Sequence, residues 1–237
     1  NILAEGVKRA TEIIGKEAEQ YAIQVKGMEA SGQDPRAQQS VGLTYAISCR
    51  GADHLRALSS LEELGFVETI EKRFGKDKVK EIQNLLSTTH KALVIKDVED
   101  LYAIVDSLLV CKYGTMWPPV YYFDDFARLI PPLTGMKEYG DPRHLRMVAE
   151  RICNLRRAFN IREGMARKDD ALHRRFMEEP MPSGPAKGYV CNLEPMLNEY
   201  YDLREWDKET GLIPRKTLEK VGLKDISDQL ERMKKLP

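Results

Sequence analysis

The sequence lacks the features that would place it in a membrane or on nucleic acid. No apolar run approaches the roughly 20 residues that a membrane-spanning helix needs, and no charged leader with an apolar core opens the chain. Basic and acidic residues number 37 each, so the basic excess typical of nucleic-acid-binding proteins is missing. We therefore expect a cytoplasmic protein with neither a membrane nor a nucleic-acid partner.

Cysteine is also scarce. The four cysteines lie far apart, and no two form a C-x-x-C pair. This spacing argues against a dense disulfide framework, a zinc site, or an iron–sulfur cluster held by this chain alone. They are Cys49, Cys111, Cys153 and Cys191.

The composition is that of a folded protein, with 42% hydrophobic and 31% charged residues. Apolar residues recur at helical spacing along most of the chain, whereas residues 21–25 alternate in the manner of one short strand with no obvious partner nearby. We predict a mainly α fold, a compact multi-helix domain with one or two short strands. Predicted helices cover residues 2–14, 35–51, 60–74, 77–90, 97–110 (capped by Asp97), 124–130, 193–204, 214–221 and 225–235.

A further long helix is predicted to begin at Asp141-Pro142, an N-cap followed by proline at the first helical position. Its expected core-facing stripe is Leu145, Val148, Ile152, Leu155 and Phe159. Residues 143–175 carry nine arginines, which we interpret as a solvated helix face with internal ion pairs rather than a phosphate-binding channel. The proline- and glycine-rich segment 180–188 is predicted to be a loop.

A carboxylate and a cysteine stand five residues apart where the predicted helix 97–110 ends. Asp106 lies in the last turn, at the negative end of the helix dipole, where cations are preferred. Cys111 follows the helix. An acid in this position indicates a role other than helix stability.

This segment resembles the motif D-x-x-G-L-C of the tungsten-containing aldehyde ferredoxin oxidoreductases. Asp106 and Cys111 match the motif, but Leu109 stands where the family has glycine and Val110 where it has leucine. The resemblance implies that Asp106 and the backbone of Leu109 and Val110 hold a tungstopterin. It implies that Cys111 binds a 4Fe-4S cluster.

The resemblance covers nearly the whole chain. It includes V-K-G-M-E-A-S-G-Q-D-P-R (25–36), G-L-T-Y-A-I-S-C-R-G-A-D-H-L-R (42–56), N-L-R-R-A-F-N-I-R-E-G-M-A-R-K-D-D (154–170), P-S-G-P-A-K-G (182–188) and E-Y-Y-D-L-R-E-W-D (199–207). It implies that residues 1–25 end a preceding helical domain and that residues 26–237 form the C-terminal helical domain. Because the chain starts with Asn1 and opens directly into a helix, we expect a piece of a longer protein.

Two further residues gain roles from the resemblance. Family members place a histidine near the tungsten, which would make His54 the residue that passes protons or hydrogen-bonds the substrate oxygen. Arg56 matches a basic residue on the phosphate side of the pterin, and its alternative is a surface ion pair. Cys111 is either a cluster ligand or a packing residue. As a ligand it would be one of four thiolates, with the other three supplied outside this chain.

The resemblance implies the C-terminal part of an enzyme that oxidises a small aldehyde to a carboxylic acid and passes electrons through the cluster to ferredoxin. Its other partners would be the N-terminal domains of the same enzyme, and a homo-oligomer stays open. The isolated chain is expected to be inactive and without cofactor. Two alternatives are a benzoyl-CoA reductase-type catalytic subunit and a cofactor-free helical interaction module. The aromatic loop containing Trp117, Tyr121, Tyr122 and Phe123 is either packing or a wall of the substrate pocket.

Overall fold

A computed structural model describes residues 2–58, 60–117 and 119–237, so that Asn1 lies outside the described residues. Within these ranges the chain forms α-helices, short 3-10 turns and a single two-stranded antiparallel sheet. This confirms the mainly α prediction. The helices are α1 (Gly6–Ile14), α2 (Gln39–Ile47), α3 (Val67–Phe74), α4 (Val79–Gln83), α5 (Lys91–Ser107), α6 (Tyr113–Met116), α7 (Phe123–Thr134), α8 (Pro142–Arg162), α9 (Arg174–Glu178), α10 (Leu193–Arg204), α11 (Arg215–Lys220) and α12 (Lys224–Arg232).

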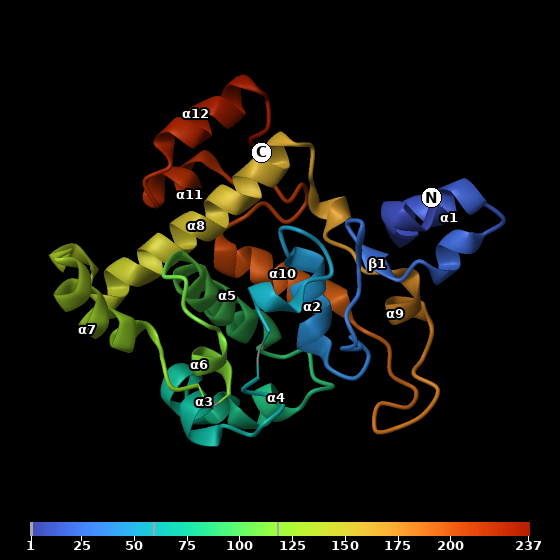
Figure 1. Ribbon diagram of the computed structural model, residues 1–237, viewed down its shortest axis with the longest axis horizontal. Helices are drawn as coiled ribbons and strands as arrows, with labels where there is room; N and C mark the ends of the chain where they lie inside the picture. The colour runs from blue at the N-terminus through green and yellow to red at the C-terminus, as the bar shows by residue number, and fades with distance from the viewer. Residues whose placement is uncertain (1, 59, 118) are drawn as a thin grey trace.

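Helix α5 is the centre of the fold. It packs against α8, α10 and α2, while α11 and α12 lie along α8 (Figure 1). Helix α1 stands at the right-hand edge of the molecule in Figure 1, across from α7, and the backbone N–H of Val7 donates to Glu29 of the hairpin at 2.9 Å. Helix α2 is buried on every side, since all nine of its residues are buried. A helix of this kind has no solvated face, so its polar side chains are hydrogen-bonded inside the protein, as Ser40 is to Glu62 and Thr44 to the carbonyl of Ala57.

The predicted strand has a partner, contrary to the sequence analysis. Strand β1 (Gln24–Val25) pairs with β2 (Met28–Glu29) across a turn formed by Lys26 and Gly27. Both turn residues have positive φ, at 52° and 88°. That geometry is typical of tight hairpins. The prediction missed the partner because the strand ends before it alternates long enough to show a pattern.

The helices predicted at 60–74 and 77–90 are wrong in half of their length. Residues 60–66 are not helical, and Ser60 instead donates to the carbonyl of Met116 at 2.7 Å. Residues 84–90 form turns in which the Asn84 and Ser87 side chains accept from the backbone N–H two residues later. Such local bonds compete with a helix.

Helix α5 begins at Lys91, six residues earlier than predicted. Asp97 is not a cap but an interior residue whose carboxylate accepts from Tyr122 at 2.6 Å and Arg146 at 3.0 Å. Lys91 is completely buried and pairs with buried Glu62 at 2.9 Å. A lysine at a helix start is normally exposed, so the burial of Lys91 could not be predicted from its local sequence.

Helix α8 confirms the predicted cap, because Asp141 accepts from the backbone N–H of Arg143 at 2.9 Å. The predicted stripe is only partly buried: Leu145 is in the core, whereas Leu155 and Phe159 are 43% and 54% exposed. The helix buries Arg157 instead, against Asp170 at 2.6 Å. Internal ion pairs of the basic segment are therefore confirmed. No helix of the described residues combines the length and apolarity needed to cross a membrane.

Candidate functional site

The end of α5 closes as a Schellman motif. The N–H of Val110 donates to the carbonyl of Val105 at 3.1 Å, and the N–H of Leu109 donates to the carbonyl of Asp106 at 3.2 Å. Between these bonds Leu109 adopts φ +55°, the left-handed conformation that this motif requires at its turning residue. Glycine is the usual residue there, because a Cβ atom is strained at positive φ.

Leu109 is 93% exposed, so its side chain contributes little packing to the protein. The backbone N–H groups of Leu109 and Val110 are already engaged in the helix end. Any ligand in this turn would therefore meet carbonyl oxygens rather than free N–H groups. This turn can accept hydrogen bonds and is poorly suited to donate them.

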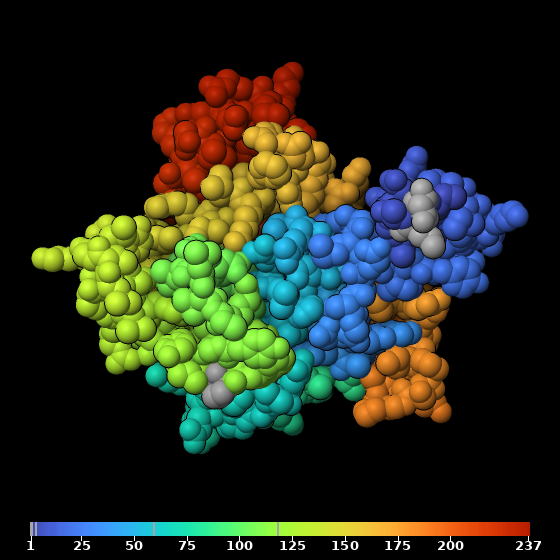
Figure 2. Space-filling view, viewed as in Figure 1, coloured from blue at the N-terminus to red at the C-terminus, as the bar shows by residue number. Residues whose placement is uncertain are grey.

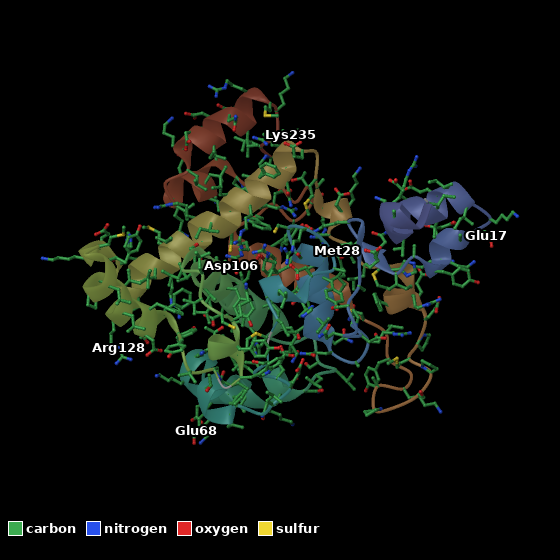
Figure 3. The ribbon with its side chains drawn as sticks, viewed as in Figure 1. Glu17, Met28, Glu68, Asp106, Arg128 and Lys235 are labelled. Carbon is green, nitrogen blue, oxygen red and sulfur yellow. The ribbon has the colours of Figure 1, made fainter. Side chains whose placement is uncertain are left out.

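Asp106 lies in the last turn of α5, beside α8 (Figure 3). Its carboxylate is surrounded by three cations from different parts of the chain. Arg56 reaches it at 2.5 Å and Arg156 of α8 at 3.6 Å, and Lys112 also donates to it. These cations explain how a carboxylate is tolerated at the negative end of a helix, because they offset its unfavourable interaction with the helix dipole.

Arg56 is placed by a second carboxylate. Asp53 caps the 3-10 turn His54–Arg56 by accepting from the N–H of Leu55 at 2.9 Å, and its other oxygen lies 3.7 Å from Nε of Arg56. Burial would raise the pKa of Asp53, but the hydrogen bonds from Arg50 and the N–H of Leu55, together with the charges of Arg50 and Arg56, outweigh it and the pKa is lowered. Nε of Arg56 is buried without a hydrogen-bond partner among the described residues, so one guanidinium donor is unused.

His54 lies in the same turn, half-buried, and is fixed from one side. Its Nδ1 is 3.0 Å from Oγ of Ser31, which in turn is 2.7 Å from the hydroxyl of buried Tyr45. Gln33 accepts from Ser31 at 2.6 Å. Burial raises the pKa of Tyr45, so its hydroxyl stays protonated near neutral pH.

Cys111 is exposed, and among the described residues no group of three or more histidine, cysteine or acidic side chains is arranged to hold a metal. Burial raises the pKa of the Cys191 thiol to about 12 and that of Cys153 well above its ordinary value. These two are packing residues. Cys49 is half-buried. Cys111 is therefore the thiol best placed to meet a group outside this chain.

The fold brings Arg56 and Asp106 together, although 50 residues separate them. It adds residues that sequence reasoning missed: Lys112 and Arg156 at the carboxylate, and Ser31, Gln33 and Tyr45 at the histidine. Lys112 could have been found from its position six residues after Asp106. The others come from distant segments and carry no local signal.

Tyr122 and Phe123 of the aromatic loop pack inside the protein. Arg73 lies 3.8 Å from the centre of the Tyr122 ring, and Arg146 lies 4.2 Å from that of Phe123. Tyr122 lines a cavity of about 800 Å³ between α3, α7 and α8, whose other walls carry mostly charged side chains. Of the two roles expected for the loop, Phe123 fits packing, and Tyr122 borders a cavity with a mainly charged lining.

Comparisons with known proteins agree on one family. The family model described as aldehyde ferredoxin oxidoreductase, domains 2 & 3, matches residues 1–223. The tungsten-containing aldehyde ferredoxin oxidoreductases of Thermococcus kodakarensis and Pyrococcus furiosus are each 34% identical to this chain over 227 residues, 94% of its length. The WOR-like subunit of an aliphatic sulfonate oxidoreductase from Pyrococcus furiosus is 27% identical over 99% of the chain. The chain spans 34% of the length of each of these relatives.

A solved structure supports the fold. The BamBC active-site complex of benzoyl coenzyme A reductase with 1,5-dienoyl-CoA matches 99% of this chain and 38% of its own, with a TM-score of 0.74 and 22% identity. At that identity the match shows a shared fold only. Because the family model covers nearly the whole chain, the protein belongs to the aldehyde ferredoxin oxidoreductase family and corresponds to its domains 2 and 3.

Proposed function

We propose that the complete protein is a tungstopterin enzyme that oxidises an aldehyde to a carboxylic acid and sends the electrons through a 4Fe-4S cluster to ferredoxin. One observation carries the proposal: the residues of the family motif, Asp106, Leu109 and exposed Cys111, follow one another at the end of α5, with Leu109 in the left-handed conformation where the family has glycine. The names of the most similar relatives support it. The tungstopterin, when bound, supplies the two-electron oxidation chemistry.

The residues fit such a cofactor in their donor chemistry. A carboxylate can accept about four hydrogen bonds, and Asp106 has two close donors and one more distant cation in this structure. Pterin N–H groups would be accepted by Asp106 and by the carbonyls of Leu109 and Val110. Nε of Arg56 is buried and faces Asp53 at 3.7 Å, so an anionic group would be met by the terminal nitrogens of its guanidinium. Cys111 offers one thiolate, and the cluster needs three more from elsewhere in the protein.

Replacing Asp106 by Asn tests the carboxylate. The amide keeps one acceptor oxygen, but its NH2 group would face the N–H donors of the pterin. We therefore expect the complete enzyme to lose tungsten while the helical fold remains. Asp202→Asn is a matched control, because Asp202 also lies in a last helical turn and pairs with a lysine six residues later. Metal analysis by mass spectrometry reads the result. Equal tungsten content in both variants would contradict the assignment.

Replacing Cys111 by Ser tests the thiolate. A hydroxyl is a poorer and harder ligand for iron than a thiolate, so cluster content or reduction potential should change in the complete enzyme. Cys49→Ser, at a half-buried cysteine, should leave both unchanged. If Cys111→Ser behaves like Cys49→Ser, then Cys111 has no part in the cluster.

His54 is assigned to proton transfer or substrate orientation. His54→Ala and His54→Asn should leave tungsten and iron bound, and should lower turnover by roughly 100- to 10,000-fold, the usual range for general acid–base help. His144→Asn serves as control, because His144 is likewise half-buried but packs against Tyr139. Turnover at the parental rate in both His54 variants would remove the catalytic role.

The partner of this surface is proposed to be the remaining part of the same enzyme. Apolar side chains cluster beside the motif, each at least 36% exposed: Leu109, Val110, Tyr113, Trp117, Val120 and Tyr121. Figure 2 shows this segment in green at the molecular surface. Contiguous exposed apolar side chains mark contact sites, and the relatives are nearly three times as long as this chain.

Hydroxyl-radical footprinting tests this contact. Tyr113 and Trp117 should be oxidised in the isolated chain and protected in the complete enzyme, whereas Leu133, 79% exposed on α7, should react equally in both. If Tyr113 and Trp117 are oxidised as readily in the complete enzyme as in the isolated chain, the contact lies elsewhere. The proposed division into residues 1–25 and 26–237, the cytoplasmic location and the oligomeric state stay predictions.

A second candidate is a benzoyl-CoA reductase-type catalytic subunit. Two observations favour it: the shared fold with the BamBC complex and the leucine in place of the motif glycine. Parallel assays of the complete enzyme with aldehydes and with aromatic acyl-CoA substrates separate the two. A protein purified anaerobically without tungsten or iron would instead support a helical interaction module.

A further inference from the structure

The hydroxyl of Ser31 has three neighbours that together use its whole hydrogen-bonding capacity. They are Oε1 of Gln33 at 2.6 Å, the hydroxyl of Tyr45 at 2.7 Å and Nδ1 of His54 at 3.0 Å. A serine hydroxyl has one proton to donate and two lone pairs to accept with. Each of the three contacts can therefore be given a direction.

The amide oxygen of Gln33 can only accept, so it takes the Ser31 proton. Tyr45 then donates to Ser31 at 2.7 Å, the shortest of its contacts, since its other two acceptors, the carbonyl and Oε1 of Gln33, lie at 3.2 and 3.4 Å. Burial raises the pKa of Tyr45 and keeps the phenol protonated. The remaining lone pair of Ser31 faces Nδ1 of His54. Two lone pairs cannot hydrogen-bond each other, so this nitrogen must carry a proton.

We propose that Ser31, Gln33 and Tyr45 hold the neutral His54 imidazole in the tautomer protonated at Nδ1, which leaves Nε2 as an unprotonated base. Nε2 has no hydrogen-bond partner within the described residues. The three side chains come from the loop after β2 and from α2, which packs on the turn that contains His54. They are positioning residues that act through His54.

The inference deepens the proposed function and rests on it for its catalytic consequence. Oxidation of an aldehyde with one water gives a carboxylic acid, two protons and two electrons. Under the proposed function the electrons leave through the cluster to ferredoxin. One of the two protons would go to the lone pair on Nε2 of His54, which the Nδ1 tautomer keeps available.

Nitrogen-15 NMR of the histidine-labelled chain tests the tautomer without any cofactor. The chain has four histidines, and His54→Asn identifies the signal of His54. At a pH where the imidazole is neutral, the parent chain should show a protonated Nδ1. Ser31→Thr keeps the hydroxyl and Gln33→Glu keeps an acceptor, so both should preserve this tautomer. Ser31→Ala removes the acceptor of the Nδ1 proton and should give a mixture of both tautomers.

A protonated Nε2 in the folded parent chain would overturn the inference, and so would an unchanged tautomer in Ser31→Ala. Circular dichroism of each variant shows that the fold is retained. In the complete enzyme, Ser31→Ala should lower kcat more than it changes KM, and Ser31→Thr should restore it. A tautomer shift with unchanged kcat would uphold the positioning and refute the catalytic role of His54, so the two failures are distinguishable.

Discussion

Replacing Leu109 by glycine should stabilise this protein, although most substitutions at a helix end do the opposite. Leu109 sits at φ +55° with a side chain that is 93% exposed. An L-residue in this conformation costs about 1–2 kcal/mol. Because the side chain is almost fully exposed, its removal forfeits little packing.

Glycine also has a cost, since it gives the unfolded chain more conformational freedom, worth about 0.5–1 kcal/mol. The net gain in the free energy of unfolding at Leu109→Gly is then about 0.5–1 kcal/mol. For a chain of this size 1 kcal/mol moves Tm by about 2–4 °C. Calorimetry should therefore find an increase of about 1–4 °C.

Leu109→Ala is the matched control, because it removes the same exposed side chain but keeps the Cβ atom that is strained at positive φ. We expect its Tm to stay close to that of the parent chain, within the roughly 0.5 kcal/mol typical of surface changes. If Leu109→Gly is no more stable than Leu109→Ala, the strain at this turn is absent and the account of the motif glycine is wrong.

Three further predictions concern groups whose surroundings are equally well defined. In the folded chain a thiol reagent should modify exposed Cys111 before Cys191, whose pKa is raised by burial to about 12; equal rates would show that the core opens readily. Gly42→Ala should lower the free energy of unfolding by about 1–3 kcal/mol through overpacking, because the added Cβ would lie 2.3 Å from Sγ of Cys191. In urea titrations, adding Cys191→Ala to Gly42→Ala should recover part of this loss. Burial would raise the pKa of Asp100, but Arg204 and Lys96 hold it below its ordinary value, so its stabilising effect is present above about pH 4 and is lost as the pH falls through the lower folded pKa. Asp100→Asn should flatten this acid limb in urea titrations, and a limb as steep as in the exposed control Asp124→Asn would contradict it.

Local signals predicted the helices whose ends are set by their own residues. Helix α10 was predicted at its observed bounds, 193–204, and α8 was located from Asp141-Pro142. The start of α5 was missed because a buried lysine, Lys91, depends on Glu62 for its charge partner. Tertiary partners of this kind override local preference, and a single sequence does not reveal them.

The same distinction separates what was predicted in the site from what was missed. The grouping of Asp106 with Cys111 depends on their short spacing in the sequence and stays a prediction. Arg156 was counted only as one arginine of a basic segment, because its carboxylate partner lies 50 residues away. Ser31 was part of a quoted segment but carried no role, since only the fold brings it to His54.

The helix-end geometry also explains why an acid and a cysteine five residues apart form a unit. In a Schellman motif the left-handed residue follows the last turn at a fixed distance, and the next residue returns its N–H to the helix. Leu109 and Val110 occupy these positions, three and four residues after Asp106, so the chain emerges at Cys111 in a direction set by hydrogen bonds within the helix end. The thiol is thereby positioned by backbone geometry alone. A leucine can replace the glycine without moving the thiol, because the strain is local and the side chain points into solvent. The strain of leucine at positive φ lowers the free energy of unfolding, and the direction in which the chain leaves the helix at Cys111 stays the same.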